Sequence, residues 1–305
     1  MYSIVIPIYN EEKTLPALCD RLTKSLASLD QPYEVLLVDD GSTDQSFRLM
    51  REIHRQDQRF KIIRLSRNFG HQVAISAGMD CATGDALLLM DGDLQDPPEL
   101  IPEMIRLWKE GSHVVYTVKK SRKENPVKRA AFQVFYRLIR SLSSVDIPME
   151  AGNFSLLDRR VVDVLRSMPE RSRYISGMRA WAGFKQSAVP YDREARFAGE
   201  PRMSFSRLAR LALDGIFSFS EAPLRLAMYL GLLTACGAFA GGLYVLYAKL
   251  FTDQAILGWA STILSILFVG GMILLTLGVI GEYISRIYEE VKKRPLYVVQ
   301  ERVGL

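Results

Sequence analysis

Residues 86–96 read ALLLMDGDLQD, an apolar run of strand length that ends in three carboxylates. Residues 34–42 repeat this arrangement as EVLLVDDGS, with two adjacent aspartates after the apolar run. Further apolar runs of strand length alternate with helix-like segments on both sides of these two. The runs lie at 3–8, 61–65 and 113–118, and the expected helices lie near 11–29, 44–57, 70–81 and 98–110. A return strand and a helix are expected within 151–165. This alternation predicts an α/β fold with a Rossmann-like, mostly parallel sheet covered on both faces.

The acids that follow the run at 86–90 suit a metal site. In open α/β sheets, ligands bind beyond the carboxyl ends of the strands. Asp91, Asp93 and the amide oxygen of Gln95 are hard oxygen ligands of the kind that Mg²⁺ or Mn²⁺ prefers. Such a metal could bridge a nucleotide diphosphate and stabilise its charge as it leaves. The alternative is a polar turn with helix caps, because residues 96–99 (DPPE) also read as a helix N-terminus.

Asp39 and Asp40 form a second acidic pair at a strand end. Adjacent carboxylates are unfavourable there unless a cation or hydrogen-bond donors meet them, and the base or ribose of a nucleotide would supply donors. A turn followed by a helix cap is the alternative. The sequence contains neither G-x-G-x-x-G nor G-x-x-x-x-G-K-[ST], which disfavours a dinucleotide-dependent dehydrogenase and a P-loop NTPase.

Two uncharged runs, 226–248 and 255–281, are each long enough to cross a hydrocarbon core of about 30 Å as a helix. Basic residues flank the pair of runs, so the positive-inside rule predicts an integral membrane protein whose catalytic part and C-terminus are cytoplasmic. The residues just before the first run have one polar and one apolar helical face, which predicts a helix along the membrane surface; packing against its own domain is the alternative. The expected organisation is a catalytic domain, an interface helix, a transmembrane hairpin and a cytoplasmic tail at 1–200, 201–222, 223–285 and 286–305.

Composition narrows the partners. The net charge is +5, from 39 basic and 34 acidic residues, and the excess gathers between residues 119 and 140. Beside a membrane anchor, such a patch fits anionic lipid or a lipid phosphate better than nucleic acid. The 3 cysteines show no C-x-x-C spacing, which argues against a disulfide framework and a structural zinc site. Small residues in the first run offer surfaces for helix association, and so for a homo-oligomer: Gly231, Gly237, Gly241 and Gly242.

Several motifs occur together in one order: PIYNE at 7–11, VDDGS at 38–42, RNFG at 67–70 and DGDLQDPPE at 91–99. With these motifs the chain resembles the GT-A glycosyltransferases of family 2, and more narrowly the polyisoprenyl-phosphate glycosyltransferases. That branch includes the dolichol-phosphate mannose synthases and the GtrB-type bactoprenol glucosyltransferases. The likeness extends through GNFS, RAWAGF and DGIFSFS to the two spans, at 152–155, 179–184 and 214–220. The two-span ending favours the GtrB-like branch.

The resemblance implies a nucleotide-sugar donor, a polyprenyl-phosphate acceptor and a role for several residues. Positions that match nucleotide-binding residues are Pro7, Tyr9, Glu11 and Asp40, and Asp39 and Asp91 are assigned to the same site. The metal site is matched by Asp91, Asp93 and Gln95, and the acceptor phosphate by Lys119 or Arg122 together with Arg129. Arg202 matches a residue that meets the donor diphosphate, although the branch often has lysine there. The expected catalytic set is Asp91, Asp93, Asp96, Arg129 and Arg202.

The chemistry expected of this set is an inverting transfer. A phosphate monoester has a second pKa near 6, so the acceptor is mostly a dianion at neutral pH and needs no strong general base. Asp96 is therefore expected to position groups. Glucose from UDP-glucose is favoured by the GtrB-like layout, and GDP-mannose or a UDP-aminoarabinose donor is the alternative. A processive polysaccharide synthase would need a larger membrane bundle, and a membrane-anchored binding protein would tolerate loss of the acids.

Overall fold

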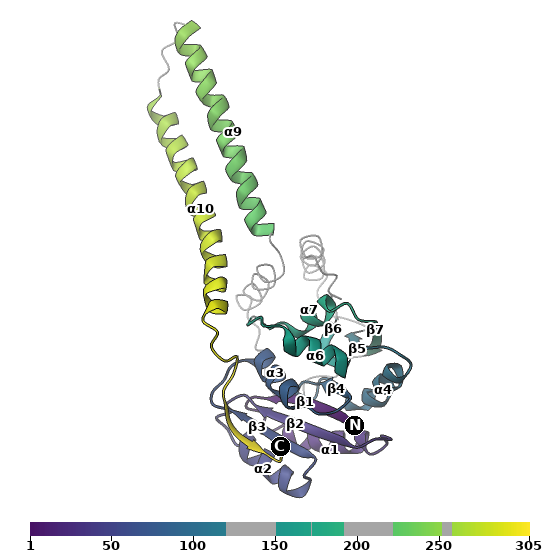
Figure 1. Ribbon diagram of the computed structural model, residues 1–305. Coiled ribbons are helices and arrows are strands. Elements are labelled where there is room, and N and C mark those ends of the chain that lie inside the picture. Colours follow the sequence, from purple (N-terminus) through teal and green to yellow (C-terminus); the bar gives the residue numbers. More distant parts are fainter. Residues whose placement is uncertain (120–150, 172, 192–221, 252–257) are drawn as a thin grey trace. The chain divides into compact units, whose positions relative to one another are not determined.

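The structure, a computed structural model, describes residues 1–119, 151–171, 173–191, 222–251 and 258–305. The chain forms two compact units, each described here by itself (Figure 1). The α/β unit comprises Met1–Arg137, Val145–Arg202 and Arg294–Leu305, and the helical unit comprises Leu138–Ser144 and Met203–Lys293.

Within the described residues, one 8-stranded sheet forms the centre of the α/β unit, in the order β7-β5-β6-β4-β1-β2-β3-β8. The neighbours β4-β1-β2-β3 are parallel, as expected, and β7 is parallel to β5, whereas β6 and β8 run antiparallel to their neighbours. The strands are β1 (Tyr2–Ile8), β2 (Tyr33–Asp39), β3 (Phe60–Leu65), β4 (Ala86–Leu89), β5 (Val114–Lys119), β6 (Ala151–Asp158), β7 (Gln186–Tyr191) and β8 (Val299–Val303).

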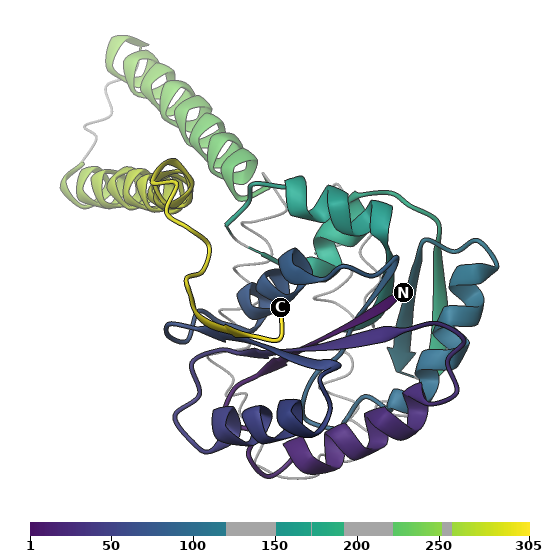
Figure 2. The ribbon, with the colours of Figure 1, turned by 60° about the horizontal axis from the view of Figure 1, so that its bottom comes forward.

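Helices cover both faces of this sheet (Figure 2). One face packs against α1 (Leu15–Leu26), α2 (Ser46–Gln56) and α4 (Ile101–Lys109), which a 3₁₀ turn at Pro98–Leu100 precedes. The other face packs against α3 (His71–Cys81), α6 (Arg159–Ser167) and α7 (Ile175–Trp181). The expected strands and helices of this unit are thus confirmed, with ends that differ by a few residues.

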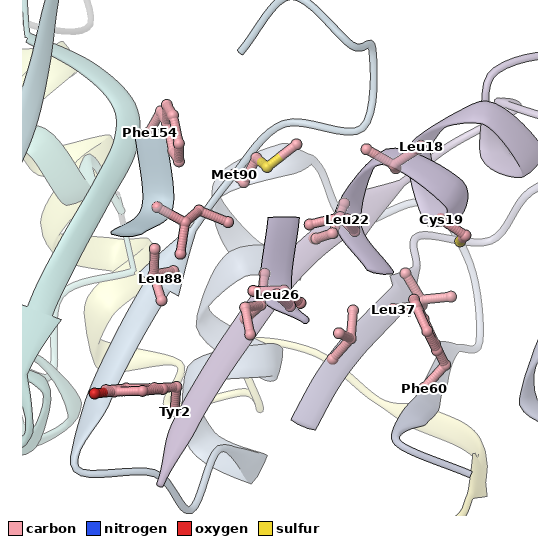
Figure 3. Packing of buried hydrophobic residues seen from close by; sticks show 14 of the residues in the cluster. Tyr2, Leu18, Cys19, Leu22, Leu26, Leu37, Phe60, Leu88, Met90 and Phe154 are labelled. Atoms are coloured by element: carbon pink, nitrogen blue, oxygen red, sulfur yellow. The ribbon is translucent and has the colours of Figure 1, made fainter. Parts of the chain in front are cut away.

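The core explains why the strands read as unbroken apolar runs. Successive side chains of a strand point to opposite faces, so Ile4 and Ile6 enter one core cluster and Val5 enters the other. Tyr2 and Phe154 lie in the same cluster as the α1 leucines (Figure 3). Each such side chain, when fully buried, contributes roughly 1.5–3 kcal/mol to stability. The two clusters hold the strands rigidly and so fix the places where the strands end.

The end of the chain returns to the sheet. β8 pairs antiparallel with β3, and the chain just before it is held by Ser66, whose N–H donates to the Val298 carbonyl at 2.9 Å. The Tyr297 hydroxyl donates to Asp80 on α3 at 2.7 Å. Residues 286–305, expected to form a tail beyond the second span, include an edge strand of the α/β unit (Figure 1).

The helical unit contains two long apolar helices, α9 (Ala222–Phe251) and α10 (Trp259–Val291), which contact each other. Both are candidate membrane spans by length and composition, over Pro223–Tyr244 and Phe268–Val291. Large apolar side chains on them are exposed, for example Phe239 at 70% and Leu274 at 71%. The expected interface helix at 201–222 lies outside the described residues except for its last residue.

Candidate active site

The carboxyl ends of β1, β2 and β4 meet at one edge of the sheet, because these strands are parallel neighbours. The segments that follow them interlock. The backbone N–H of Asn10 donates to the Ser42 hydroxyl at 3.1 Å, and the Thr43 N–H donates to the Asn10 side chain at 2.8 Å. The sheet therefore brings the PIYNE, VDDGS and DGD segments together, and Asn10 and Ser42 join the assigned residues there.

Pro7 and Tyr9 occupy the β1 end of this edge. The backbone groups of Pro7 point toward β4, as do those of Val5, whose carbonyl accepts from the Met90 N–H at 3.1 Å. The pairing of β1 with β4 ends at Val5. The missing N–H of Pro7 therefore breaks no bond of the ladder. Two positions farther along, the Tyr9 side chain is 37% exposed at the surface of the edge.

Glu11 and Glu12 tie the β1 loop to the start of α2. The Glu11 N–H donates to the Ser46 hydroxyl at 2.8 Å, and its carboxylate accepts from Thr14 at 2.9 Å. The Glu12 carboxylate accepts from the Gln45 N–H at 3.0 Å. The backbone N–H and the carboxylate of Glu11 therefore both help to hold the loop.

Asp39 is fully buried at the end of β2. Its Oδ1 accepts from the Ser42 N–H at 2.9 Å, and its Oδ2 lies 3.3 Å from Nε of Arg64, whose guanidinium stacks over Phe47. Burial raises the pKa of the Asp39 carboxyl, although the contacts with Ser42 and Arg64 oppose this. Oδ2 has no hydrogen-bond partner within the described structure, so a donor would stabilise its ionised form.

Asp40 holds the next loop. Its two carboxylate oxygens accept from the backbone N–H groups of Phe69 and Gly70, at 2.7 and 3.0 Å. Gly41 has φ +70°, and a Cβ there would lie 2.5 Å from the carbonyl carbon of Arg67. VDDGS and RNFG are therefore two sides of one contact. Burial raises the pKa of the Asp40 carboxyl, against the effect of the two backbone donors.

The D-x-D segment is shaped by close packing. A Cβ at Gly92 would lie 2.8 Å from the Ile8 side chain, so glycine lets the segment approach β1. Leu94 is buried with φ 59°, a left-handed conformation that is unfavourable for leucine and turns the chain sharply. Asp93 accepts from the Gln95 N–H at 3.2 Å, and Asp91 accepts from His71 Nε2 at 2.9 Å.

Asp96 differs from the other acids of this segment. Its side chain is buried, and the Tyr191 hydroxyl at the end of β7 donates to its Oδ1 at 2.8 Å. Asp96 therefore connects the D-x-D segment to β7, the edge strand next to β5.

The acids fit a hard divalent cation through their donor set. Asp91 keeps 29% of its side chain exposed, and Asp93 and Gln95 are also only partly buried, so oxygen atoms are accessible at this edge. In the described part of the chain, no three His, Cys, Asp or Glu side chains converge in a metal-binding cluster. Two carboxylates and an amide leave coordination positions for phosphate oxygens and water, as Mg²⁺ and Mn²⁺ sites require.

His71 and Gln72, which sequence reasoning missed, link this edge to β6 and α7. Gln72 donates to the Asn153 side chain at 3.3 Å and accepts from the Ile175 N–H at 3.0 Å. Although desolvation lowers it, the pKa of His71 is raised overall by its hydrogen bond to Asp91 and by nearby carboxylates. The available signal was their place directly after RNFG at a helix start.

The role of Arg179, within the RAWAGF motif, was also not predicted from the sequence. Its side chain is 1% exposed, donates to the Gly152 carbonyl at 3.2 Å and lies over the Tyr116 ring at 5.2 Å. Burial lowers its pKa to about 10. No carboxylate of the described residues forms an ion pair with it, so an anionic group would complete its surroundings.

The expected phosphate-binding cations lie mostly outside the described residues. Lys119 is the last residue of β5, and Arg122, Arg129 and Arg202 belong to segments that the structure does not describe. The strand end at Lys119 pairs with Tyr191, the residue that donates to Asp96.

Comparison with known proteins identifies the class. Residues 3–166 match glycosyl transferase family 2, and residues 222–287 match the GtrB C-terminal hairpin. The chain belongs to glycosyl transferase family 2 and is a glycosyltransferase with a GT-A fold.

Particular relatives share nearly its whole length. Glycosyltransferase YkcC of Bacillus subtilis is 48% identical over 305 residues, covering 100% of this chain and 94% of that one. The bactoprenol glucosyl transferase of Shigella phage SfII is 36% identical over 300 residues, covering 98% and 97%. Glucosyl-3-phosphoglycerate synthase of Mycobacterium tuberculosis, crystallised with Mn²⁺, UDP and phosphoglyceric acid, shares the fold, with TM-score 0.50, 18% identity and coverage of 71% and 76%.

Proposed function

We propose that this enzyme transfers glucose from UDP-glucose to a polyprenyl phosphate at the cytoplasmic membrane face, with inversion at the anomeric carbon. The supporting observation is the 36% identity to bactoprenol glucosyl transferases over 98% of the chain, which includes the hairpin. The acidic edge of the sheet supplies a site suited to such a donor.

The donor nucleotide would lie over the ends of β1 and β2. Tyr9 presents a partly exposed ring beside the interlocked loops, which suits stacking on a base. Asp39 has an acceptor oxygen without a hydrogen-bond partner in the described structure, and a base or ribose carries donors. Asp40 and Glu11 support the site by holding its loops, because their carboxylates accept from Phe69, Gly70 and Thr14.

The diphosphate would lie at the end of β4. Asp91, Asp93 and Gln95 would hold a divalent cation there, and that cation would offset the negative charge that grows on the leaving diphosphate. Gly92 keeps the segment close against β1, so the acids are presented from a rigid sheet edge.

The acceptor requires positioning more than activation. Its phosphate is mostly a dianion at neutral pH, so one of its oxygens can bond to the anomeric carbon as the bond to the diphosphate breaks. Two unit charges about 5 Å apart repel by roughly 3 kcal/mol at an effective dielectric constant near 20. Lys119, Arg122, Arg129 and Arg202 are proposed to offset that repulsion. Asp96, buried against Tyr191, is proposed to position this side of the site.

The hairpin brings the site to its lipid. A polyprenyl chain leaves the bilayer at a cost of about 0.8 kcal/mol per exposed CH₂, so the enzyme must work at the membrane. Residues earlier in the chain than the hairpin and residues 299–303 after it belong to the same sheet, so a hairpin that crosses a membrane twice would have both outer ends on one side. The basic flanks support a cytoplasmic location for that side. A Cβ at Gly231, Gly237, Gly241 or Gly242 would meet no atom within 4 Å, which suits a proposed homo-oligomer.

The test is transfer by the purified full chain in detergent. It is incubated with polyprenyl phosphate and, separately, labelled UDP-glucose, GDP-mannose and a UDP-aminoarabinose donor, with Mn²⁺ or Mg²⁺. The expected product is polyprenyl-phosphate glucose, formed from UDP-glucose alone, and no product is expected from unphosphorylated polyprenol. Transfer only from another donor would overturn the glucose assignment, and nucleotide binding without any transfer would overturn the acceptor assignment.

A further inference from the structure

The start of α3 carries side chains that neither the nucleotide nor the metal assignment uses. His71 is the first residue of this helix, and its Nε2 donates to Oδ1 of Asp91 at 2.9 Å. Both side chains are partly exposed, at 43% and 29%. The contact therefore joins the helix start directly to the first acid of the D-x-D segment.

The helix start is itself fixed from the β2 side. Asp40 is 3% exposed and accepts from the last two backbone N–H groups before the helix, those of Phe69 and Gly70. Gly41 packs against the backbone of Arg67 so closely that a Cβ would not fit. The position of the His71 backbone is thereby determined by the same turn that ends β2.

Gln72 fixes the helix start from the opposite side. Its amide donates to Asn153 on β6 and accepts from the backbone N–H of Ile175, the first residue of α7. Contacts from β2, β6 and α7 thus hold two successive helix residues. A side chain carried on such a rigid support can orient a neighbouring group accurately.

We propose that His71 is a positioning residue for the divalent-cation site, because it fixes the direction of the Asp91 carboxylate. This inference rests on the proposed metal-dependent function. A carboxylate at a partly exposed strand end turns easily about its last torsion, and a hydrogen bond from a rigid helix removes that freedom. Loss of such an outer partner typically weakens metal binding by about 10- to 100-fold. Asp40 contributes through the backbone of the helix start.

The test measures Mn²⁺ binding directly, with the full chain in detergent and saturating UDP, by the electron paramagnetic resonance signal of free Mn²⁺. His71→Ala is expected to raise the Kd for Mn²⁺ about 10-fold or more. His71→Gln, whose amide can still donate to Asp91, is expected to restore most of that affinity. His54→Ala is the matched control, because His54 on α2 contacts the Phe60 carbonyl away from the acids. Its Kd is expected to equal that of the wild type.

Thermal unfolding without metal separates positioning from folding. His71→Ala is expected to melt no lower than His54→Ala while binding Mn²⁺ more weakly. Wild-type affinity in His71→Ala would overturn this inference and leave the proposed function standing. The inference would also be overturned if His71→Gln and His54→Ala raised the Kd for Mn²⁺ as much as His71→Ala does. A wild-type chain that binds no Mn²⁺ with UDP would instead remove the metal site itself.

Discussion

Asp39 and Asp40 follow the same strand, yet their carboxylates face different neighbours. Asp39 closes the turn through Ser42 and pairs with Arg64, while Asp40 holds the backbone at the start of α3. Burial raises the pKa of both carboxyls, so the ionised form of either one is less stable in the folded protein than in the unfolded chain. Donors from a bound nucleotide would offset that effect at Asp39, where one oxygen has no hydrogen-bond partner in the described structure.

Asp93→Ala is predicted to lower metal-dependent transfer about 100-fold or more, since metal stabilisation of a leaving group is worth several kcal/mol. The side chain is partly exposed and accepts from the Gln95 N–H, only two residues away, so the fold should remain. Initial rates against Mn²⁺ concentration, with circular dichroism for the fold, provide the measurement. Asp20→Ala, an exposed acid of α1, is the control. Full activity of Asp93→Ala would remove this residue from the metal site.

Glu34 gives a prediction about pH. Burial acts to raise its pKa, but hydrogen bonds from Lys61, Ser3 and Thr83 outweigh it and hold the pKa below its ordinary value of 4.5. A lowered carboxyl pKa adds stability above the unfolded value, and that stability is lost as pH falls through the folded value. Glu34→Gln should therefore melt about 2 to 4 °C lower at pH 7, with a smaller gap below pH 4.5. Melting curves across pH 3.5–7 test this, and a gap that widens in acid would contradict it.

At the scale of elements, the segments with dense local patterns follow the sequence closely. The apolar run before Asp91 predicts β4, and the acids follow that strand directly, because a buried parallel strand needs apolar residues on both faces. β8 is different. Residues 299–303 (VQERV) alternate between apolar and polar residues, and nothing local indicates which strand they join. Only the packed sheet shows that they cover β3.

Removal of residues 295–305 is predicted to destabilise the α/β unit. It exposes the edge of β3 and breaks the Tyr297–Asp80 hydrogen bond, and an uncovered edge strand favours aggregation. The full chain and the truncated chain are compared by melting temperature and by size-exclusion chromatography in detergent. Removal of Leu305 alone, which is 48% exposed, is the control. A truncated chain that melts with the control would mean that β8 contributes nothing to stability.

At the scale of the whole molecule, the chain leaves the α/β unit, forms the hairpin and comes back to complete the sheet. A helix rises about 1.5 Å per residue, so α9, with 30 residues, and α10, with 33, each exceed a hydrocarbon core of about 30 Å. Because the chain returns to the same sheet, the two helices must either both cross the membrane or both stay on one side of it.

Cysteine labelling tests the proposed topology. In a background without the three native cysteines, Lys24→Cys and Gln300→Cys should react with an impermeant maleimide only in inside-out vesicles, because both are exposed residues outside the candidate spans and on the side proposed to be cytoplasmic. Asp253→Cys, between the two helices, should react only in right-side-out vesicles. Labelling of all three from one side would contradict two crossings.

The sequence by itself determined the family, the order of strands and helices from β1 to β5, the return strand and helix within 151–165, the acids that follow the strands and the two apolar helices; α7 and β7 were not predicted. The predicted features are local, because each is written in a continuous run or a short motif whose physical meaning does not depend on distant residues. Only the tertiary structure decided that Asp40 holds the start of α3, that His71 contacts Asp91 and that β8 closes the sheet. Those contacts join residues far apart in the chain, and they exist only once strand order and packing have placed the backbones side by side.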